Sequence, residues 1–262
     1  MDPAESPDVQ TPGDFAPGIY DIDLQTYLNE QAHVSSSMLK RVLESPEALQ
    51  RYLARRHESA PVLDFGTAVH CALLEPARFE DEYVALPVQR ADMIHEADMA
   101  LIKAQRSDVY FITEAQMQAV RSICEHVRQL PEVMALLRDG LAEQSLFWQD
   151  EATGIRCKIR PDLLVLPHLI LELKTTFNPS LAVFQRTALM QRYHLSAAMY
   201  LDGVAQVTGH RPRYMYLVAG RHAPNEVLTF VPSEAMLREG DRLYRQALTV
   251  IKGLSNNEAN GL

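Results

Sequence analysis

The chain has 262 residues, of which 47% are hydrophobic and 23% are charged, values typical of a globular protein with one large domain or two small ones. Its formal net charge of −9 argues against non-specific coating of nucleic acid, although it does not exclude a local basic groove. The three cysteines lack CxxC spacing, which argues against a zinc site or a disulfide framework and favours reduced thiols.

The N-terminal residues 1–18 are predicted to form a disordered arm, because they hold four prolines among small and acidic residues. They lack the apolar core of a secretory signal, and no apolar run in the chain approaches the roughly 18 residues that span a bilayer. We therefore expect a cytoplasmic protein without a membrane segment. A single folded domain is expected over residues 19–254, followed by a flexible tail over residues 255–262.

The first half of the chain is predicted to be mainly helical. Ser35 or Ser36 can cap one helix, Pro46 can begin the next, and Thr113 can cap a longer one with an apolar stripe. Residues 77–110 are predicted as loop and helix with solvated charges. The expected helices cover residues 35–45, 46–53, 61–74, 113–130 and 131–137.

Apolar runs in the middle of the chain predict strands. Two runs rich in Leu, Ile and Val indicate neighbouring strands over residues 157–166 and 168–175. A preceding strand is expected over residues 143–150, joined to them by a hairpin turn in which Gly154 is available for a positive φ. The three strands would form a meander.

Three charged residues fall on the last two of these strands. Glu172 and Lys174 are two residues apart and therefore point to the same face, where Asp162 on the neighbouring strand can also reach. Paired carboxylates suit a hard cation such as Mg²⁺, and a lysine beside them can stabilise charge that develops at phosphorus. The triplet alone leaves a plain alternative open, an aspartate at a strand end beside a surface Glu–Lys pair.

The remainder of the chain alternates helices with strands. Residues 191–207 carry Tyr193, Ala197 and Tyr200 at helical spacings of three and four. The interleaved pattern predicts an α/β fold with a central mixed β-sheet flanked by helices. No glycine-rich phosphate loop is present, so use of ATP is not indicated. The expected elements are helices 179–189, 191–207 and 233–254 and strands 211–220 and 225–231.

Several short motifs occur in a recognisable order. Pro161-Asp162, nine residues and then Glu172-Leu173-Lys174 resemble the PD-(D/E)xK nuclease signature. The other motifs, in order, are His33–Lys40, Ser45-Pro46, Phe65–His70, Glu143 and Tyr193–Tyr200. Together with these motifs, roughly residues 20–250 resemble RecE-like exonucleases (exodeoxyribonuclease VIII).

The resemblance implies a restriction-endonuclease-like core and a role for each matching residue. His70, Asp162, Glu172 and the backbone carbonyl of Leu173 would hold the metal ions, and Lys174 would position or polarise the attacking water. Mg²⁺ is the expected cofactor. Mn²⁺ should also support activity, because imidazole is a softer ligand than Mg²⁺ prefers.

Other positions carry weaker expectations. Glu143 could reach a metal directly or through water, or could remain a solvated glutamate at a strand edge. The family has a Gln-x-x-x-Tyr pair where this chain has Ser196 four residues before Tyr200, so the supporting hydrogen bond would shift to Gln191 or His194 or be lost. The residues expected to contact DNA or support the site are Ser35, Thr175, Gln191, Ser196 and Tyr200.

The function implied by the resemblance is metal-dependent hydrolysis of linear duplex DNA by an exonuclease. Digestion would run 5′ to 3′ and leave a 3′ single strand for recombination, in phage or prophage, by a RecT-like single-strand annealing protein. A ring-shaped homo-oligomer would explain processivity on double-stranded DNA ends despite the acidic charge. The alternatives are an endonuclease, a RecB-like single-strand nuclease, or a catalytically weakened DNA-binding module. Ser196 favours the last of these, and the intact Asp–Glu–Lys set argues against it.

Overall fold

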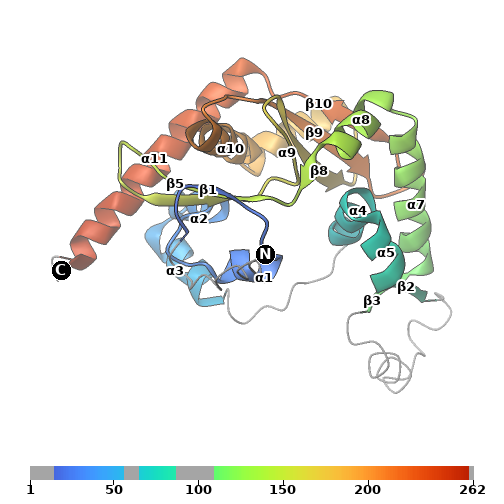
Figure 1. Ribbon diagram of the computed structural model, residues 1–262, viewed down its shortest axis with the longest axis horizontal. Coiled ribbons are helices and arrows are strands. Elements are labelled where there is room, and N and C mark those ends of the chain that lie inside the picture. Colours follow the sequence, from blue (N-terminus) through green and yellow to red (C-terminus); the bar gives the residue numbers. More distant parts are fainter. Residues whose placement is uncertain (1–14, 56–64, 87–108, 260–262) are drawn as a thin grey trace, which may run out of the picture.

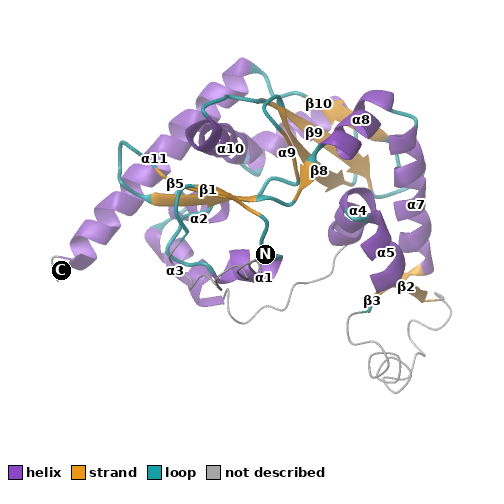
Figure 2. Cartoon of the chain, viewed as in Figure 1, coloured by secondary structure: helices purple, strands orange, loops and turns teal. Residues whose placement is uncertain are grey.

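A mixed β-sheet with helices on both faces organises the molecule (Figures 1 and 2). The computed structural model describes residues 15–55, 65–86 and 109–259. The main sheet has five strands in the order β10–β9–β8–β7–β4, in which β8 and β9 are parallel and the other pairs are antiparallel. Its strands are β4 (Leu141–Ala142), β7 (Leu163–Val165), β8 (Leu169–Thr176), β9 (Arg213–Gly220) and β10 (Val227–Phe230).

The parallel pair β8 and β9 forms the centre of this sheet. Parallel neighbours need a long crossover, which α9 (Leu181–Met190) and α10 (Tyr193–Thr208) supply. Gly209 ends α10 in the left-handed conformation, with φ 75°, which glycine adopts without steric cost.

The two faces of the sheet are both buried, because alternate residues of β8 and β9 are apolar on each side. Ile170 and Tyr216 pack with α9, α10 and the long C-terminal helix α11 (Glu234–Ala259). Leu171 and Leu217 pack with the helices of the opposite face. These are α4 (Phe65–Leu74), α7 (Glu114–Arg128) and α8 (Pro131–Asp139). The predicted fold class, a central mixed sheet flanked by helices, is confirmed.

Two smaller sheets complete the described structure. A three-stranded antiparallel sheet has the order β1–β5–β6, and β2 pairs with β3 in parallel. Their strands are β1 (Gly18–Tyr20), β2 (Tyr83–Leu86), β3 (Tyr110–Thr113), β5 (Ser145–Gln149) and β6 (Arg156–Ile159). The remaining helices are α1 (Leu24–Asn29), α2 (Ser36–Val42), α3 (Pro46–Arg55) and α5 (Pro76–Glu82).

The predicted meander is wrong at one point. The expected strand over residues 157–166 is divided into β6 and β7, and these belong to different sheets. Pro161 lies in the break, and proline has no N–H to donate to a strand ladder. The chain therefore leaves one sheet at Arg160 and joins the next after Asp162, which places this aspartate at the junction of the two.

Other predicted boundaries also need correction. Residues 1–14 of the predicted disordered arm lie outside the described part, but Phe15 is buried against Phe147 and Gly18 begins β1. Residues 77–110 contain β2 and the first residue of β3 besides most of helix α5, and residues 87–108 lie outside the description. Helix α11 continues to Ala259 through most of the predicted flexible tail.

Local signals in the sequence gave correct ends for several elements. Thr113 and Gln116 form the reciprocal capping box that starts α7. Pro131 occupies the first turn of α8, and Gly154 has a φ of 73° in its hairpin turn. Among the helices in the described ranges, none has the length and hydropathy needed to cross a membrane.

Candidate active site

Asp162 and Glu172 are locked together by two backbone hydrogen bonds across the sheet junction. The backbone N–H of Leu173 donates to Oδ2 of Asp162 at 2.6 Å, and the N–H of Asp162 donates to Oε1 of Glu172 at 3.2 Å. This arrangement follows from the register of β7 and β8, which pairs Leu163 with Leu171 and so brings the preceding aspartate beside Glu172. The predicted convergence of the two carboxylates is therefore present.

Lys174 lies against the same two carboxylates. Its Nζ is 2.9 Å from Oε2 of Glu172 and 4.0 Å from Oδ2 of Asp162, and it donates to the carbonyl of Leu173 at 2.8 Å. The lysine side chain is 24% exposed, so most of it is buried beside these carboxylates.

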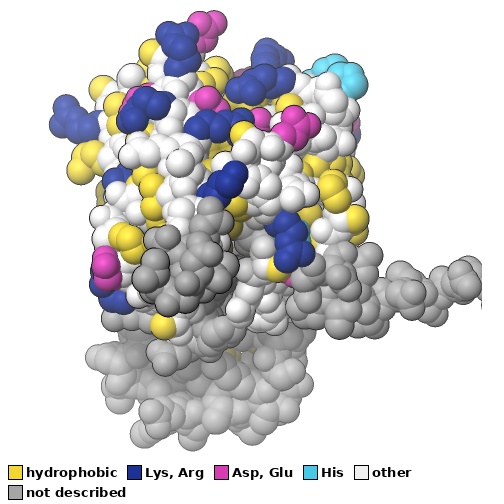
Figure 3. All heavy atoms as spheres, turned by 90° about the vertical axis from the view of Figure 1, so that its left-hand side faces the viewer, with side chains coloured by type: hydrophobic (Ala, Val, Ile, Leu, Met, Phe, Trp, Pro, Cys, Tyr) yellow, Lys and Arg dark blue, Asp and Glu magenta, His cyan; other side chains and the backbone are white. Residues whose placement is uncertain are grey.

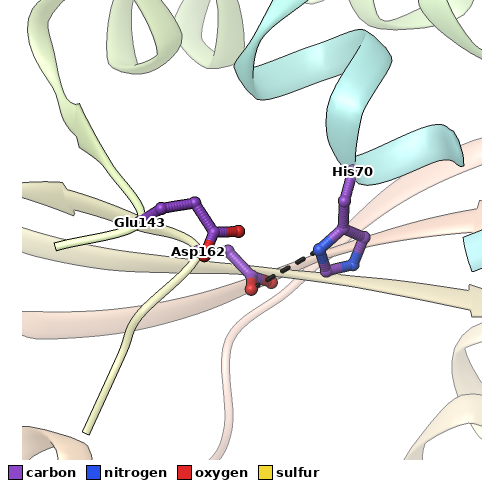
Figure 4. Close-up of side chains that lie close together, drawn as sticks. All are labelled: His70, Glu143 and Asp162. Carbon is purple, nitrogen blue, oxygen red and sulfur yellow. Dashed lines mark ion pairs between the residues drawn. The ribbon is translucent and has the colours of Figure 1, made fainter. Parts of the chain in front are cut away.

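His70 and Glu143 approach Asp162 from other parts of the chain (Figure 4). Nδ1 of His70, on α4, is 3.5 Å from Oδ1 of Asp162, and His70 also hydrogen-bonds to the backbone of Leu173. Glu143 lies between β4 and β5 with a φ of 54°, and its backbone N–H donates to the carbonyl of Asp162 at 3.1 Å. Ligand atoms of His70, Glu143 and Asp162 all lie within 4.8 Å of one another.

The grouping of possible metal ligands differs from the one expected from sequence. The expected set contained Glu172, whose oxygens contact Lys174 and the backbone of Asp162 instead. Glu143, left open between a ligand and a solvated side chain, joins His70 and Asp162. Arg160 was not anticipated, although its Nε donates to Oε2 of Glu143 at 2.7 Å and holds that carboxylate in place. Its position directly before Pro161-Asp162 was the available signal.

Burial shifts the proton affinities of the whole group. It raises the pKa of Asp162, and burial together with the charge of Asp162 raises the pKa values of Glu172 and Glu143. Burial also lowers the pKa of His70, with Lys174 adding to the effect. For Lys174 burial opposes the charged form, but the charges of Glu172 and Asp162 outweigh it and raise the pKa.

These shifts fit a divalent cation. A neutral imidazole offers a lone pair, and carboxylates buried close together gain from a nearby positive charge. One imidazole and two carboxylates form a donor set suited to Mn²⁺ or Mg²⁺, with water or substrate oxygens completing the coordination. The side chains of His70, Glu143 and Asp162 therefore fit a metal, and the carbonyl of Leu173 lies beside His70.

Of the expected supporting residues on α10, Tyr200 lies near the carboxylates of Glu172 and Asp162. Tyr200 is half-buried and hydrogen-bonds to Ser36 on α2, and burial and Glu172 raise the pKa of its hydroxyl. Ser196 is half-buried one turn earlier on the same helix. His194 is buried, with Nδ1 3.3 Å from the carbonyl of Ala188 on α9.

Three further expected residues have structural neighbours of their own. Ser35 is the N-cap residue of α2 and makes no side-chain capping bond. Gln191 is exposed at the end of α9 and lines a pocket. Thr175 follows Lys174 on β8, so its side chain points to the opposite face, where its hydroxyl accepts hydrogen bonds from Arg221 at 3.1 and 3.2 Å.

The fold is that of PDDEXK-like proteins, and the interlocked Asp–Glu–Lys group coincides with the residues of this sequence that resemble the PD-(D/E)xK signature. A solved structure agrees with this fold: a "Putative exonuclease" from Eubacterium rectale, 13% identical, matches with a TM-score of 0.59 over 89% of this chain and 88% of its own. A second structure, of SSO0001, is 14% identical over 82% of this chain and 84% of its own, with a TM-score of 0.31 that is too low to support an argument.

The particular family follows from the sequence itself. Residues 35–261 match the family described as "PDDEXK-like domain of unknown function (DUF3799)", and the chain belongs to this family. A search of curated proteins found no match. The comparisons establish the superfamily, and the finer resemblance to RecE stays a prediction.

Proposed function

We propose that the protein is a metal-dependent deoxyribonuclease that hydrolyses phosphodiester bonds. The observation that carries this proposal is the interlocking of Asp162, Glu172 and Lys174 beside His70 and Glu143. A purely structural ion pair would not need a neutral imidazole and a third carboxylate at the same point. The family and the fold point to the same chemistry.

The residues divide the work of hydrolysis as follows. A divalent cation, when bound by His70, Glu143 and Asp162, supplies positive charge to the scissile phosphate and acidifies the attacking water. Asp162 is held in place by the N–H of Leu173. Glu172 fixes Lys174, whose ammonium group stabilises negative charge as it develops and positions the water for attack.

The finer activity we propose is exonucleolytic digestion of linear duplex DNA, 5′ to 3′, that leaves a 3′ single strand for recombination. The ordered RecE-like motifs support it, as does the exonuclease description of the Eubacterium rectale protein. The same proposal includes Mg²⁺ as the cofactor, with Mn²⁺ as a substitute. It also includes a ring-shaped homo-oligomer, a RecT-like annealing partner and a role in phage or prophage recombination in the cytoplasm. Among the described residues on the molecular face in Figure 3, lysine and arginine side chains are more prominent than acidic ones, so a net charge of −9 does not prevent local attraction of DNA.

The test is digestion of a 5′-labelled linear duplex and of a covalently closed circle. Each substrate is incubated with Mg²⁺, with Mn²⁺ or with EDTA, beside the Asp162→Ala variant. We expect loss of the linear substrate only, dependent on metal and absent in the variant. Labels placed at the 5′ and 3′ ends in separate reactions report the polarity.

Each of the other outcomes would contradict one part of the proposal and indicate a different activity. Cleavage of the circle would indicate an endonuclease, and preferential digestion of single strands a RecB-like activity. Absence of cleavage from a protein that still binds DNA would indicate a binding module, and Ser196→Gln, which restores the family residue, would be the next variant.

A further inference from the structure

A pocket lies between α2 and the start of α10, outside the group of carboxylates. Its volume is about 390 Å³. Its walls combine positively charged and aromatic side chains, which is the composition of sites that bind nucleic-acid strands. The basic and aromatic lining residues are Lys40, Arg41, Arg192, Tyr52 and Tyr193, and one carboxylate, Glu44, also lines the pocket.

Tyr193 joins this pocket to the candidate active site. Nζ of Lys40 lies 5.4 Å from the centre of the Tyr193 ring, and Nζ of Lys174 lies 5.7 Å from the same centre. Both are cation–π contacts with one ring. Tyr193 is thus a wall of the pocket that also touches the lysine of the Asp–Glu–Lys group, so a strand that crosses the ring would reach both places.

Two cations of the pocket have no carboxylate partner within ion-pair distance among the described residues. Arg41 is paired with Glu44 at 3.0 Å, whereas Lys40 and Arg192 form no ion pair in the described ranges. Lys40 is half-buried, and burial and the charge of Lys174 lower its pKa to about 8. A partly buried ammonium without an ion-pair partner is unfavourable, and a bound anion would relieve this cost.

The position of Arg192 is fixed by its backbone. It has a φ of 52°, a conformation that non-glycine residues adopt infrequently, in the single turn between α9 and α10. The side chain of Arg192 reaches α2, where Nη1 donates to the carbonyl of Lys40 at 2.9 Å. The two unpaired cations are therefore held next to each other at one pocket.

We propose that this pocket is a binding site for a phosphate of the DNA strand, next to the scissile phosphate, with Lys40 and Arg192 as its ligands and Tyr193 as the wall between the two positions. This inference rests on the proposed function. A phosphate group matches two adjacent cations, and the rings of Tyr52 and Tyr193 suit the attached nucleoside. An apolar ligand would leave both charges unmatched.

The test measures DNA binding separately from cleavage. Full-length protein carrying Asp162→Asn, in EDTA, is titrated into a fluorescent duplex at several NaCl concentrations, and the fluorescence anisotropy gives Kd. Lys40→Gln and Arg192→Gln are each expected to weaken binding by about tenfold, as for loss of a charge-assisted hydrogen bond. Each should also reduce the slope of log Kd against log salt by about one.

Control variants separate this effect from a general loss of charge or of folding. Arg128→Gln, on the exposed surface of α7, removes the same charge far from the pocket and should leave Kd unchanged. Lys40→Arg keeps the charge and should retain most of the affinity. Thermal unfolding of each variant shows whether it is folded, and Lys40→Gln is not expected to lower the melting temperature because it removes a half-buried charge.

Two duplexes identify the source of the phosphate. One carries a 5′-phosphate and the other a 5′-hydroxyl. If the Lys40→Gln penalty appears only with the 5′-phosphate, the site binds the terminal monoester, and if it appears equally with both, the site binds an internal diester.

Two results would overturn the proposal, and they are distinguishable. If Lys40→Gln and Arg192→Gln bind with wild-type Kd and salt slope while the wild-type protein cleaves DNA, the pocket is not a phosphate site and the nuclease function stands. If the wild-type protein neither binds nor cleaves DNA, both proposals are wrong.

Discussion

Two clusters in this molecule each place aspartate or glutamate side chains around one basic residue. The candidate active site has Asp162, Glu172 and Lys174. The second cluster, in which Arg245 of α11 bridges Asp150 and Asp202, lies beside α10. In the first cluster the pKa values of Asp162 and Glu172 are raised. In the second cluster the aspartates accept hydrogen bonds from other groups of the protein.

In the second cluster the carboxylate oxygens of both aspartates have hydrogen-bond donors within the protein. Asp150 accepts from the backbone N–H and the hydroxyl of Thr153 at 2.8 and 2.6 Å, and from Arg245 at 2.6 Å. Asp202 accepts from Arg245 at 2.9 Å and from the hydroxyl of Tyr244 at 3.0 Å. By contrast, Oδ1 of Asp162 faces Nδ1 of His70 at 3.5 Å, beyond a good hydrogen bond. The comparison indicates one cluster that stabilises the fold and one that is arranged for a ligand.

The largest effect is expected from Asp162→Asn. The amide can still accept from the N–H of Leu173 but removes a metal ligand and a charge. Cleavage should fall by about 10³-fold or more, because a bound metal supplies several kcal/mol of charge stabilisation. Without metal, the melting temperature should stay equal or rise slightly as carboxylate repulsion is relieved. If Asp162→Asn retains cleavage, Asp162 is not part of the active site.

Lys174→Met is expected to lower kcat by about 100-fold, in the range of one lost electrostatic contact to the transition state. The change keeps the length of the side chain and removes only the ammonium group. Metal binding should survive, since the lysine is not a ligand. Single-turnover cleavage at saturating Mg²⁺ measures the step, and near wild-type rates would contradict the role given to Lys174.

Asp150→Asn should have the opposite profile. The NH₂ group of asparagine would face the guanidinium of Arg245, so we expect a loss of about 2 kcal/mol in unfolding free energy, at the low end for a broken ion pair because Arg245 is 39% exposed. Activity per folded molecule should be unchanged. Urea unfolding with a parallel cleavage assay measures both, and a catalytic defect in a stable Asp150→Asn protein would break the distinction between the clusters.

The smallest effect concerns pH in metal-free protein. Because the folded-state pKa values of Asp162 and Glu172 are raised above their ordinary values of 3.8 and 4.5, the folded state binds protons more tightly than the unfolded state. The stabilisation they contribute is therefore present at low pH and is lost as pH rises from the ordinary values through the folded pKa values. Asp162→Asn should flatten this part of the stability curve measured by thermal unfolding. If the stability of the variant falls equally steeply with rising pH, other titratable groups cause the pH dependence.

Sequence reasoning reached the parts of this structure that depend on local spacing. Glu172 and Lys174 lie on one face because strand side chains alternate between faces. Thr113 marks the start of a helix because its hydroxyl accepts a hydrogen bond from a backbone N–H of the first turn. The order of the motifs indicated the superfamily that the comparisons establish.

Contacts between distant residues were beyond such reasoning. Arg160 and Glu143 meet because the chain breaks at Pro161, and Asp150 meets Arg245 across 95 positions of sequence. The parallel pairing of β2 with β3 was missed for the same reason, since no local pattern specifies a partner strand. The pocket at Tyr193 brings residues of α2 and α3 together with residues at the start of α10, a contact that the sequence does not reveal.

The central claim is that His70, Glu143 and Asp162 bind a divalent cation. Isothermal titration calorimetry with Mn²⁺ tests it most directly, using the wild-type protein, Asp162→Asn and Asp150→Asn. Saturable binding to the wild-type protein and to Asp150→Asn, with loss of binding in Asp162→Asn, is the predicted result. Equal binding by Asp162→Asn, or no binding by a folded wild-type protein, would contradict the account.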